Sequence, residues 1–352
     1  MGLNAGRGLR RVVAAVVATL VGASLLAACE APKPANTLIA FLLASDQAHR
    51  WVNADEPAFA KRVKQTCKGC DYLTLNARGD AQQQAEQFQQ ALDEGADAIV
   101  LNAVDAELAE ELVVAAGDVP VIAYDRFVAG ADYFVSYDAT ATGTLQAQAV
   151  LAAAPAGRKP AVLLINGGSR DGNALAIKRA RAAVLGTQVR VLDELEPETW
   201  AGDLAGAWVT AQLRKTRATE IDAILAGNDN QAAAVVEALR QANVPPKRFP
   251  LITGQDADLE AVRRIVRGEQ ALTVYKPINV EAAQAADIAV QLVTGGTVSG
   301  ASEVEGVAAF VFTPQAVTID NLTDTVVRDR LYSIAEICDT DTLADCERLG
   351  IS

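Results

Sequence analysis

The sequence predicts an α/β protein with two doubly wound, parallel-sheet lobes. Short apolar runs alternate with helical patterns along most of the chain. The runs are continuously apolar, as in TLIAFLLA at 37–44, which is typical of parallel strands covered by helices on both faces. A length of 352 residues suits two domains, and the repeated βα units are too many for one small sheet. The pattern changes character near 138–143, where we divide the lobes.

The elements follow in order after a leader segment. In the first half, strands are expected at 37–44, 72–76, 98–102, 119–124 and 133–137, with helices at 57–65, 81–94 and 106–116. In the second half, helices at 140–153, 173–185, 204–215 and 231–242 alternate with strands at 161–166, 189–195, 223–226 and 251–253. A short helix over 259–266 then precedes a strand at 272–275, which stops at Lys276-Pro277. One late strand is expected within 307–319.

The first 28 residues are predicted to be a signal peptide. Three arginines precede a short apolar run at 12–26, which is too short to span a membrane. The run ends in LAAC, which resembles the bacterial lipobox, so cleavage before Cys29 and lipid attachment to its thiol are expected. An ordinary secretory signal is the alternative. Residues 29–36 then form a short polar tether.

Charge and composition exclude several classes of function. The net charge is −13, and removal of the three leader arginines leaves 28 basic against 44 acidic residues, or −16. Such a chain repels nucleic acid. His49 is the only histidine, so a multi-histidine metal site is excluded. We predict no metal, no cofactor and no nucleic-acid partner.

Four further cysteines form two close pairs, Cys67 with Cys70 and Cys338 with Cys346. Disulfides are the default in an exported chain. A C-x-x-C pair is also typical of thioredoxin-like redox sites, or it could supply half of the ligands of a zinc site. The first pair, however, precedes a strand rather than a helix start, where thiolates are stabilised, and four zinc ligands would require the distant second pair.

Polar side chains follow most of the predicted strands. Ligands bind beyond the carboxyl ends of strands in open parallel sheets. Carboxylates accept hydrogen bonds, Arg and Lys donate them, Asn does both, and Trp stacks on the apolar face of a sugar. These properties suit a hydroxyl-rich guest. The candidate binding residues are Arg50, Trp51, Asp125, Arg126, Asp171, Asn173, Trp200, Asn228, Asp256 and Lys276.

Each candidate has a structural alternative. Asp171, Asn173, Asn228 and Asp256 are equally suited to capping helices. Asp125-Arg126 could be a surface ion pair, and the two tryptophans could belong to the core. The GGS at 167–169 lacks a following Walker lysine, and no G-x-G-x-x-G occurs, so nucleotide binding is not expected.

Five motifs carry a resemblance to a known family. They are AYDR (123–126), GGSRDGNA (167–174), GNDNQAA (227–233), GQDADL (254–259) and TVYKPI (273–278). From residue 38 to about 330, the chain resembles the periplasmic sugar-binding proteins of ABC importers, in the D-xylose-binding branch. The resemblance implies a type I periplasmic-binding-protein fold with three hinge crossings. The implied lobes are 37–138 plus 277–307 and 139–276 plus 308–335, followed by a tail at 336–352.

The resemblance also implies a function and assigns the ten candidates to the ligand. A monomeric, non-enzymatic protein outside the cytoplasm, lipid-anchored or periplasmic, would capture a monosaccharide, D-xylose first, and deliver it to an ABC permease. A sensor subunit that presents an aldose such as glucose, arabinose, galactose or ribose to a membrane receptor is one alternative. A glycosidase using Asp125 and Asp256 is another.

Overall fold

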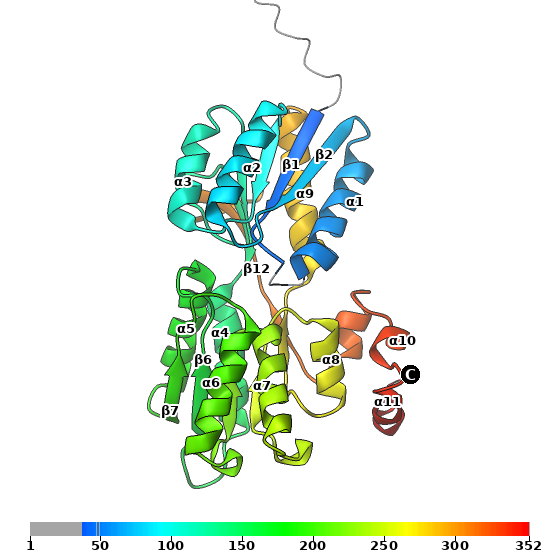
Figure 1. Ribbon diagram of the computed structural model, residues 1–352. Helices are drawn as coiled ribbons and strands as arrows, with labels where there is room; N and C mark the ends of the chain where they lie inside the picture. Colours follow the sequence, from blue (N-terminus) through cyan, green and yellow to red (C-terminus); the bar gives the residue numbers. More distant parts are fainter. Residues whose placement is uncertain (1–36, 47, 49, 352) are drawn as a thin grey trace, which may run out of the picture. The chain divides into compact units, whose positions relative to one another are not determined.

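The computed structural model describes residues 37–46, 48 and 50–351. The predicted signal peptide (1–28), the predicted tether (29–36) and the predicted lipidation site Cys29 therefore lie outside the described residues. Within the described part, no helix combines the length and the apolar character that a membrane crossing requires. The described chain forms two lobes, each with its own sheet (Figure 1).

The first lobe contains a seven-stranded sheet in the order β11-β12-β5-β4-β3-β1-β2. All neighbours run parallel except β11, which is antiparallel to β12 and was not predicted. In the β1–β2 pair, the register runs from Thr37 opposite Cys70 to Leu43 opposite Asn76. The strands are β1 (Thr37–Leu43), β2 (Cys70–Asn76), β3 (Ala98–Leu101), β4 (Val121–Tyr124), β5 (Tyr133–Tyr137), β11 (Ser302–Val304) and β12 (Val307–Phe312).

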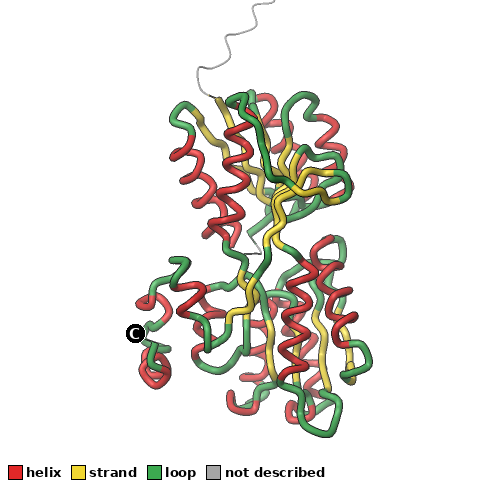
Figure 2. Tube along the Cα trace, turned by 180° about the vertical axis from the view of Figure 1, so that it is seen from behind, coloured by secondary structure: helices red, strands yellow, loops and turns green. Residues whose placement is uncertain are grey.

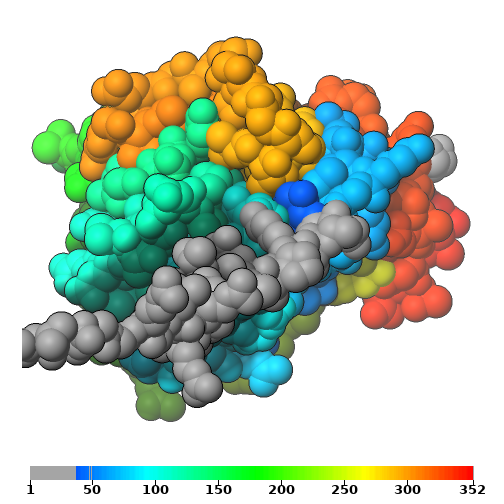
Figure 3. Space-filling model, turned by 90° about the horizontal axis from the view of Figure 1, so that it is seen from above, coloured from blue at the N-terminus to red at the C-terminus, as the bar shows by residue number. Residues whose placement is uncertain are grey.

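Helices cover both faces of this sheet, which explains why central strands such as β3 and β4 are apolar and buried throughout. In β1, Phe41 packs in an apolar cluster with α1 and α9, while Leu42 packs in a second cluster with α2 and α3. In the view from above, α9 (gold) lies beside α1 (blue) (Figure 3). The helices are the π-helical turn η1 (Trp51–Asp55), α1 (Glu56–Thr66), α2 (Ala81–Asp93), α3 (Ala106–Ala115) and α9 (Ile278–Val293).

The second lobe repeats the plan with a four-stranded parallel sheet in the order β7-β6-β8-β9. Its apolar clusters place α4 and α5 on one face and α6 and α7 on the other. A two-stranded antiparallel sheet, β10-β13, joins it through a bridge between Gln255 and Val274. The strands are β6 (Ala161–Ile165), β7 (Arg190–Leu195), β8 (Ala223–Leu225), β9 (Leu251–Thr253), β10 (Thr273–Tyr275) and β13 (Gln315–Val317). The helices are α4 (Ala139–Ala152), α5 (Gly172–Leu185), α6 (Gly202–Lys215), α7 (Asp229–Gln241) and α8 (Leu259–Val266), with 3₁₀ turns η2 (Ala218–Glu220) and η3 (Pro246–Arg248).

The chain passes between the lobes three times, after β5, after β10 and between β12 and β13 (Figure 2). The prediction of one late strand within 307–319 was wrong, because the last crossing lies inside that run. That run is two strands in different lobes, separated at Thr313-Pro314, because proline cannot continue the ladder. Residues 308–312 therefore belong to the first lobe and not, as expected, to the second.

The C-terminal segment packs on the second lobe. Ile337 and Cys346 belong to an apolar cluster with Val262 and Val266 of α8. The segment consists of the π-helical turn η4 (Thr323–Val327), α10 (Ile334–Ile337) and α11 (Leu343–Leu349), and Cys338 is joined to Cys346. The second disulfide joins Cys67 to Cys70 at the C-terminal end of α1. Both pairs thus form disulfides, which is the pairing that the sequence favours.

Candidate functional site between the lobes

A cavity of about 20 Å³ lies where strand ends of the two lobes meet. It holds about one water molecule, so a larger guest enters only when the lobes or their side chains move apart. Two larger hollows flank it, of about 610 and 560 Å³. The cavity is lined by Ala48, Trp51, Asp125, Arg126, Asp171, Asn173, Trp200, Asn228, Gln255, Asp256 and Lys276.

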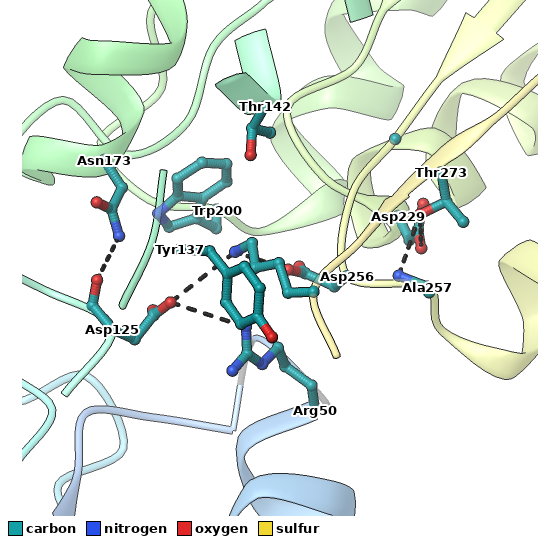
Figure 4. A network of polar contacts seen from close by, with 12 residues as sticks. Arg50, Asp125, Tyr137, Thr142, Asn173, Trp200, Asp229, Asp256, Ala257 and Thr273 are labelled. Atoms are coloured by element: carbon teal, nitrogen blue, oxygen red, sulfur yellow. Dashed lines mark hydrogen bonds and ion pairs between the residues drawn. The ribbon is translucent and has the colours of Figure 1, made fainter. Parts of the chain in front are cut away.

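Nine of the ten predicted residues therefore share this cavity. The tenth, Arg50, lines the 610 Å³ hollow, and its Nη1 lies 3.7 Å from Asp125 Oδ1. Figure 4 shows Arg50 and Asp125 of the first lobe and Trp200 and Asp256 of the second turned toward one another. Gln255 also lines the cavity, but the candidate list omits it. The sequence signal for Gln255 was its position two residues after the predicted strand at 251–253.

Strand ends explain the convergence of these side chains. Asp125 follows β4, Asn228 lies just beyond β8, Asp256 lies just beyond β9, and Lys276 follows β10. The backbones of Asp125 (φ +60°) and Asp256 (φ +97°) adopt the left-handed region, which is costly for residues with a side chain. The fold thus accepts backbone strain on both sides of the cavity to direct two carboxylates into it.

Lys276 lies between those two carboxylates. Its Nζ is 3.3 Å from Asp256 Oδ1 and 3.9 Å from Asp125 Oδ1. Burial lowers the pKa of Lys276, but Asp256 and Asp125 outweigh burial, so the pKa lies above its ordinary value. The amine is therefore a charged donor at neutral pH.

The pKa values of Asp125 and Asp256 are shifted in opposite directions. Burial raises the pKa of Asp125, but Lys276, Arg50 and Arg126 together outweigh it, and the pKa is lowered. Burial raises the pKa of Asp256 above its ordinary value, although Lys276 and Arg50 oppose this effect. Asp125 is thus the firmly ionised acceptor of the pair.

Two direct contacts connect the lobes beside the cavity. Arg126 Nε of the first lobe lies 2.9 Å from Asp171 Oδ2 of the second. Asn173 Nδ2 donates to the main-chain oxygen of Asp125 at 2.7 Å. Asp125-Arg126 is therefore not an isolated surface pair, because both residues contact the opposite lobe.

Some side chains at the cavity also cap a helix. Asp171 Oδ1 accepts from the main-chain nitrogen of Asn173 at 2.8 Å and caps α5, while Oδ2 accepts from Trp200 Nε1 at 2.9 Å. Asn228 caps α7 through its Oδ1, which accepts from Gln231 N at 2.9 Å, and leaves its amide nitrogen for other contacts. Asp256 caps no helix. The capping and binding alternatives are thus compatible for Asp171 and Asn228.

The two tryptophans are largely buried at the cavity, at 4% exposed for Trp51 and 8% for Trp200. The Arg126 guanidinium lies over the Trp51 ring, 4.9 Å from its centre. The Trp200 ring lies against Gly167, where a Cβ atom would approach it to 2.3 Å, so only glycine fits there. Both rings are therefore fixed in place.

Several buried polar atoms at the site have no hydrogen-bond partner among the described residues. They are Arg50 Nη1, Trp51 Nε1, Asp125 Oδ1 and Gln255 Oε1. Buried polar atoms are rarely left unpaired, because each costs about 1–3 kcal/mol. Their concentration around one cavity indicates a site for a polar guest. The described residues contain no cluster of His, Cys, Asp and Glu suited to a metal ion.

Comparison with known proteins agrees with this geometry. Residues 39–297 match the family described as the periplasmic binding protein domain. The D-xylose-binding periplasmic protein of Haemophilus influenzae is 29% identical over 297 residues, covering 81% of this chain and 87% of the relative. Its counterpart in Escherichia coli is 29% identical over 301 residues, covering 82% and 88%.

Solved structures share the fold. A carbohydrate transporter solute-binding protein from Chloroflexus aurantiacus, in complex with D-glucose, has a TM-score of 0.76 at 23% identity and covers 85% of this chain and 97% of its own. The Caulobacter myo-inositol-binding protein has a TM-score of 0.72 at 22% identity and covers 86% and 99%. With three-quarters of the chain matched and the two-lobed topology in common, the protein belongs to the periplasmic binding protein domain family.

Proposed function

We propose that the protein binds a monosaccharide outside the cytoplasm, D-xylose first, and delivers it as a monomer to the permease of an ABC transporter. The observation that carries the proposal is the set of unpaired buried polar atoms around one cavity between the lobes. A sugar supplies hydroxyl groups that both donate and accept, so one neutral guest satisfies cationic donors and carboxylate acceptors together.

A neutral guest fits better than an ion. The cavity carries charges of both signs, because Arg126 and Lys276 face Asp125, Asp171 and Asp256. An anion would meet three carboxylates, and a cation would meet two fixed positive groups. The indole rings add apolar faces that match the C–H groups of a sugar ring.

Capture follows from lobe movement. Opening separates Arg126 from Asp171 and Asn173 from Asp125, which exposes the polar atoms of both lobes to water. A sugar that contacts both lobes shifts the population toward the closed form by its differential affinity. Closure then excludes water, which strengthens the charge-assisted hydrogen bonds to the hydroxyls.

Binding is favoured over cleavage by the position of Lys276. A glycosidase needs one carboxyl group as proton donor and one as base or nucleophile, facing each other across the bond. Here the ammonium of Lys276 stands between Asp125 and Asp256. We therefore propose that the protein is not an enzyme, and that aryl xylosides stay intact during prolonged incubation with it.

The sugar preference is tested by calorimetric titration with D-xylose, D-glucose, L-arabinose, D-ribose and D-galactose. We expect the tightest binding for D-xylose, because relatives named for that sugar align over four-fifths of the chain. A pentose and a hexose differ by one hydroxymethyl group, so the expected preference is about 10- to 100-fold. A flat xylose trace with strong hexose binding would refute the xylose assignment, and no response to any sugar would refute the proposed function.

We also propose that lipid on Cys29 anchors the protein to the outer face of the cell membrane. Cys29→Ser removes the thiol that receives the lipid, so we expect the protein to move from the membrane fraction to the soluble fraction of cells. Fractionation and metabolic labelling with a radioactive fatty acid measure this change. Ala28→Gly keeps the thiol and serves as the control. Equal labelling of both variants would contradict the assignment.

A further inference from the structure

A group of buried charges lies directly behind the cavity in the first lobe. Its centre is Arg50, which is 3% exposed, and Asp55 and Glu281 are fully buried beside it. Arg50 Nε donates to Asp55 Oδ2 at 2.9 Å, and Arg50 Nη2 bonds to the carboxylates of both Asp55 and Glu281. The hydroxyl of Tyr124 donates to Asp55. Two carboxylates thus hold one edge of the guanidinium.

The remaining nitrogen of that guanidinium faces the site. Arg50 Nη1 has no hydrogen-bond partner within the described chain and lies 3.7 Å from Asp125 Oδ1, which also has no hydrogen-bond partner there (Figure 4). Because the guanidinium is planar and rigid, fixing Nε and Nη2 also fixes the direction of Nη1. The acids behind Arg50 therefore determine where its free donor points.

Glu281 comes from a different part of the chain than its partner. It lies on α9, which begins at Ile278, directly after the crossing that carries Lys276. Near that crossing, the hydroxyl of Tyr137 donates to the main-chain oxygen of Pro277 at 2.8 Å. Glu281 thus connects Arg50 to the helix that leaves the hinge. Its Oε1 has no hydrogen-bond partner among the described residues.

A buried acid with an unpaired oxygen is expensive for folding alone. Leaving a buried carboxyl group incompletely paired costs stability, and an apolar residue of similar size would pack there without that cost. The surrounding residues of α9, such as Ala282 and Ala285, are apolar and fully buried. Its contact with Arg50 therefore explains why position 281 is an acid.

We propose that Glu281 is a positioning residue for the sugar site: it fixes the guanidinium of Arg50 so that Nη1 serves the ligand cavity, and it ties that donor to the helix after the hinge crossing. The inference rests on the proposed function and adds a residue that neither touches the cavity nor appears among the sequence candidates. Arg50 acts as the donor, and Glu281 acts only through it.

The proton on Glu281 gives this role a measurable signature. The pKa of Glu281 is raised to about 8, because burial and, to a smaller extent, Asp125 and Asp55 raise it while Arg50 lowers it. Below that pH Glu281 is neutral; above it, the carboxylate of Glu281 competes for the positive charge of Arg50, which weakens the hydrogen bond from the guanidinium to a hydroxyl. Sugar affinity should therefore fall as the pH rises through 8. The ionisable groups that face this group are Arg50 and Asp55 beside η1, Tyr124 and Asp125 at the end of β4, Tyr137 of β5 and Lys276.

The test compares Glu281→Gln and Glu281→Ala with a matched acid on the same helix. Asp287 of α9 also binds an arginine of the first lobe, Arg62 of α1, at 2.7 Å, but both side chains are partly exposed. Asp287→Asn therefore removes an α9–arginine pair without touching the site. Each protein is titrated with D-xylose and with D-glucose from pH 6 to 9, and its melting temperature is recorded.

We expect Glu281→Ala to weaken binding about tenfold or more, because Arg50 loses a partner that fixes it. Glu281→Gln keeps the shape, so it should bind more tightly than the alanine variant, without the fall in affinity near pH 8. Asp287→Asn should match the wild type in its sugar affinity and in the pH dependence of that affinity. If Glu281→Ala does not fold, the pH profile of Glu281→Gln decides.

Two results overturn the proposal in distinguishable ways. Wild-type protein that binds neither sugar at any pH removes the proposed function and this inference with it. Wild-type protein that binds, together with a Glu281→Gln variant whose affinity and pH profile equal those of Asp287→Asn, removes the positioning role alone and leaves the proposed function intact.

Discussion

Replacing Trp200 by alanine is expected to weaken sugar binding about a hundredfold while the protein stays folded. The ring forms part of the cavity wall, and its Nε1 donates to the same Asp171 oxygen that approaches Arg126. The substitution therefore removes an apolar face and frees Asp171 Oδ2 from one of its two partners. Isothermal calorimetry gives the affinity, and circular dichroism gives the melting temperature.

The fold should survive because Trp200 packs in a small satellite cluster with Ala174 and Ile177, outside the main cores of the second lobe. Trp208 is the matched control. It lies on α6 in the same lobe and packs against the larger core, so Trp208→Ala should lower stability and leave sugar affinity unchanged. Trp200→Phe separates the two roles, because it keeps an aromatic face without the N–H donor. Affinity of Trp200→Ala equal to that of Trp208→Ala would count against the contribution of the ring.

The order of most strands and helices could be read from the sequence because it depends on local pattern, although α9 and β11 were not predicted. The central strands of the first lobe face helices on both sides, so a run such as 38–43 is apolar at every position. The strand ends then place polar residues at one edge. Nine of the ten candidates share the cavity because topology, and not any single motif, brings carboxyl ends of parallel strands together.

The parts that were missed depend on long-range contacts. Thr313-Pro314 divides the run at 307–319, but the partners β5 and β10 decide which lobe each half joins. Glu281 lies on α9, which was not predicted, and has no local signal. Its role depends on Arg50, which lies 231 residues earlier in the chain. Gln255 had a signal, since it precedes Asp256 in the loop that follows β9, but a neutral amide is common in loops.

Lys276→Met is expected to weaken sugar binding by two to three orders of magnitude at pH 8. Lys276 is the cation between Asp125 of the first lobe and Asp256 of the second, and all three side chains are largely buried. Removing one partner of a buried pair costs about 3–5 kcal/mol, because the remaining charge is left uncompensated. Here two carboxylates lose their shared partner, and their repulsion opposes closure of the lobes.

The pH dependence separates this mechanism from a simple loss of contact. Without Lys276, the pKa of Asp256, which burial already raises, should rise further, so one carboxyl group takes up a proton on acidification. Part of the lost affinity should therefore return at pH 5, and small-angle X-ray scattering with saturating sugar should show the closed form returning with it. A Lys276→Met variant with equally weak binding at pH 5 and pH 8 would contradict the charge argument.

Two controls complete the design. Lys276→Arg keeps the charge and should retain more affinity than the methionine variant at pH 8. Lys178→Met removes a lysine of the same lobe that pairs with Glu196 on an exposed surface, where an ion pair contributes little. It should bind like the wild type at both pH values. The expected difference between the two methionine variants follows from burial, since each removes one lysine that faces two carboxylates, but only Lys276 does so away from water.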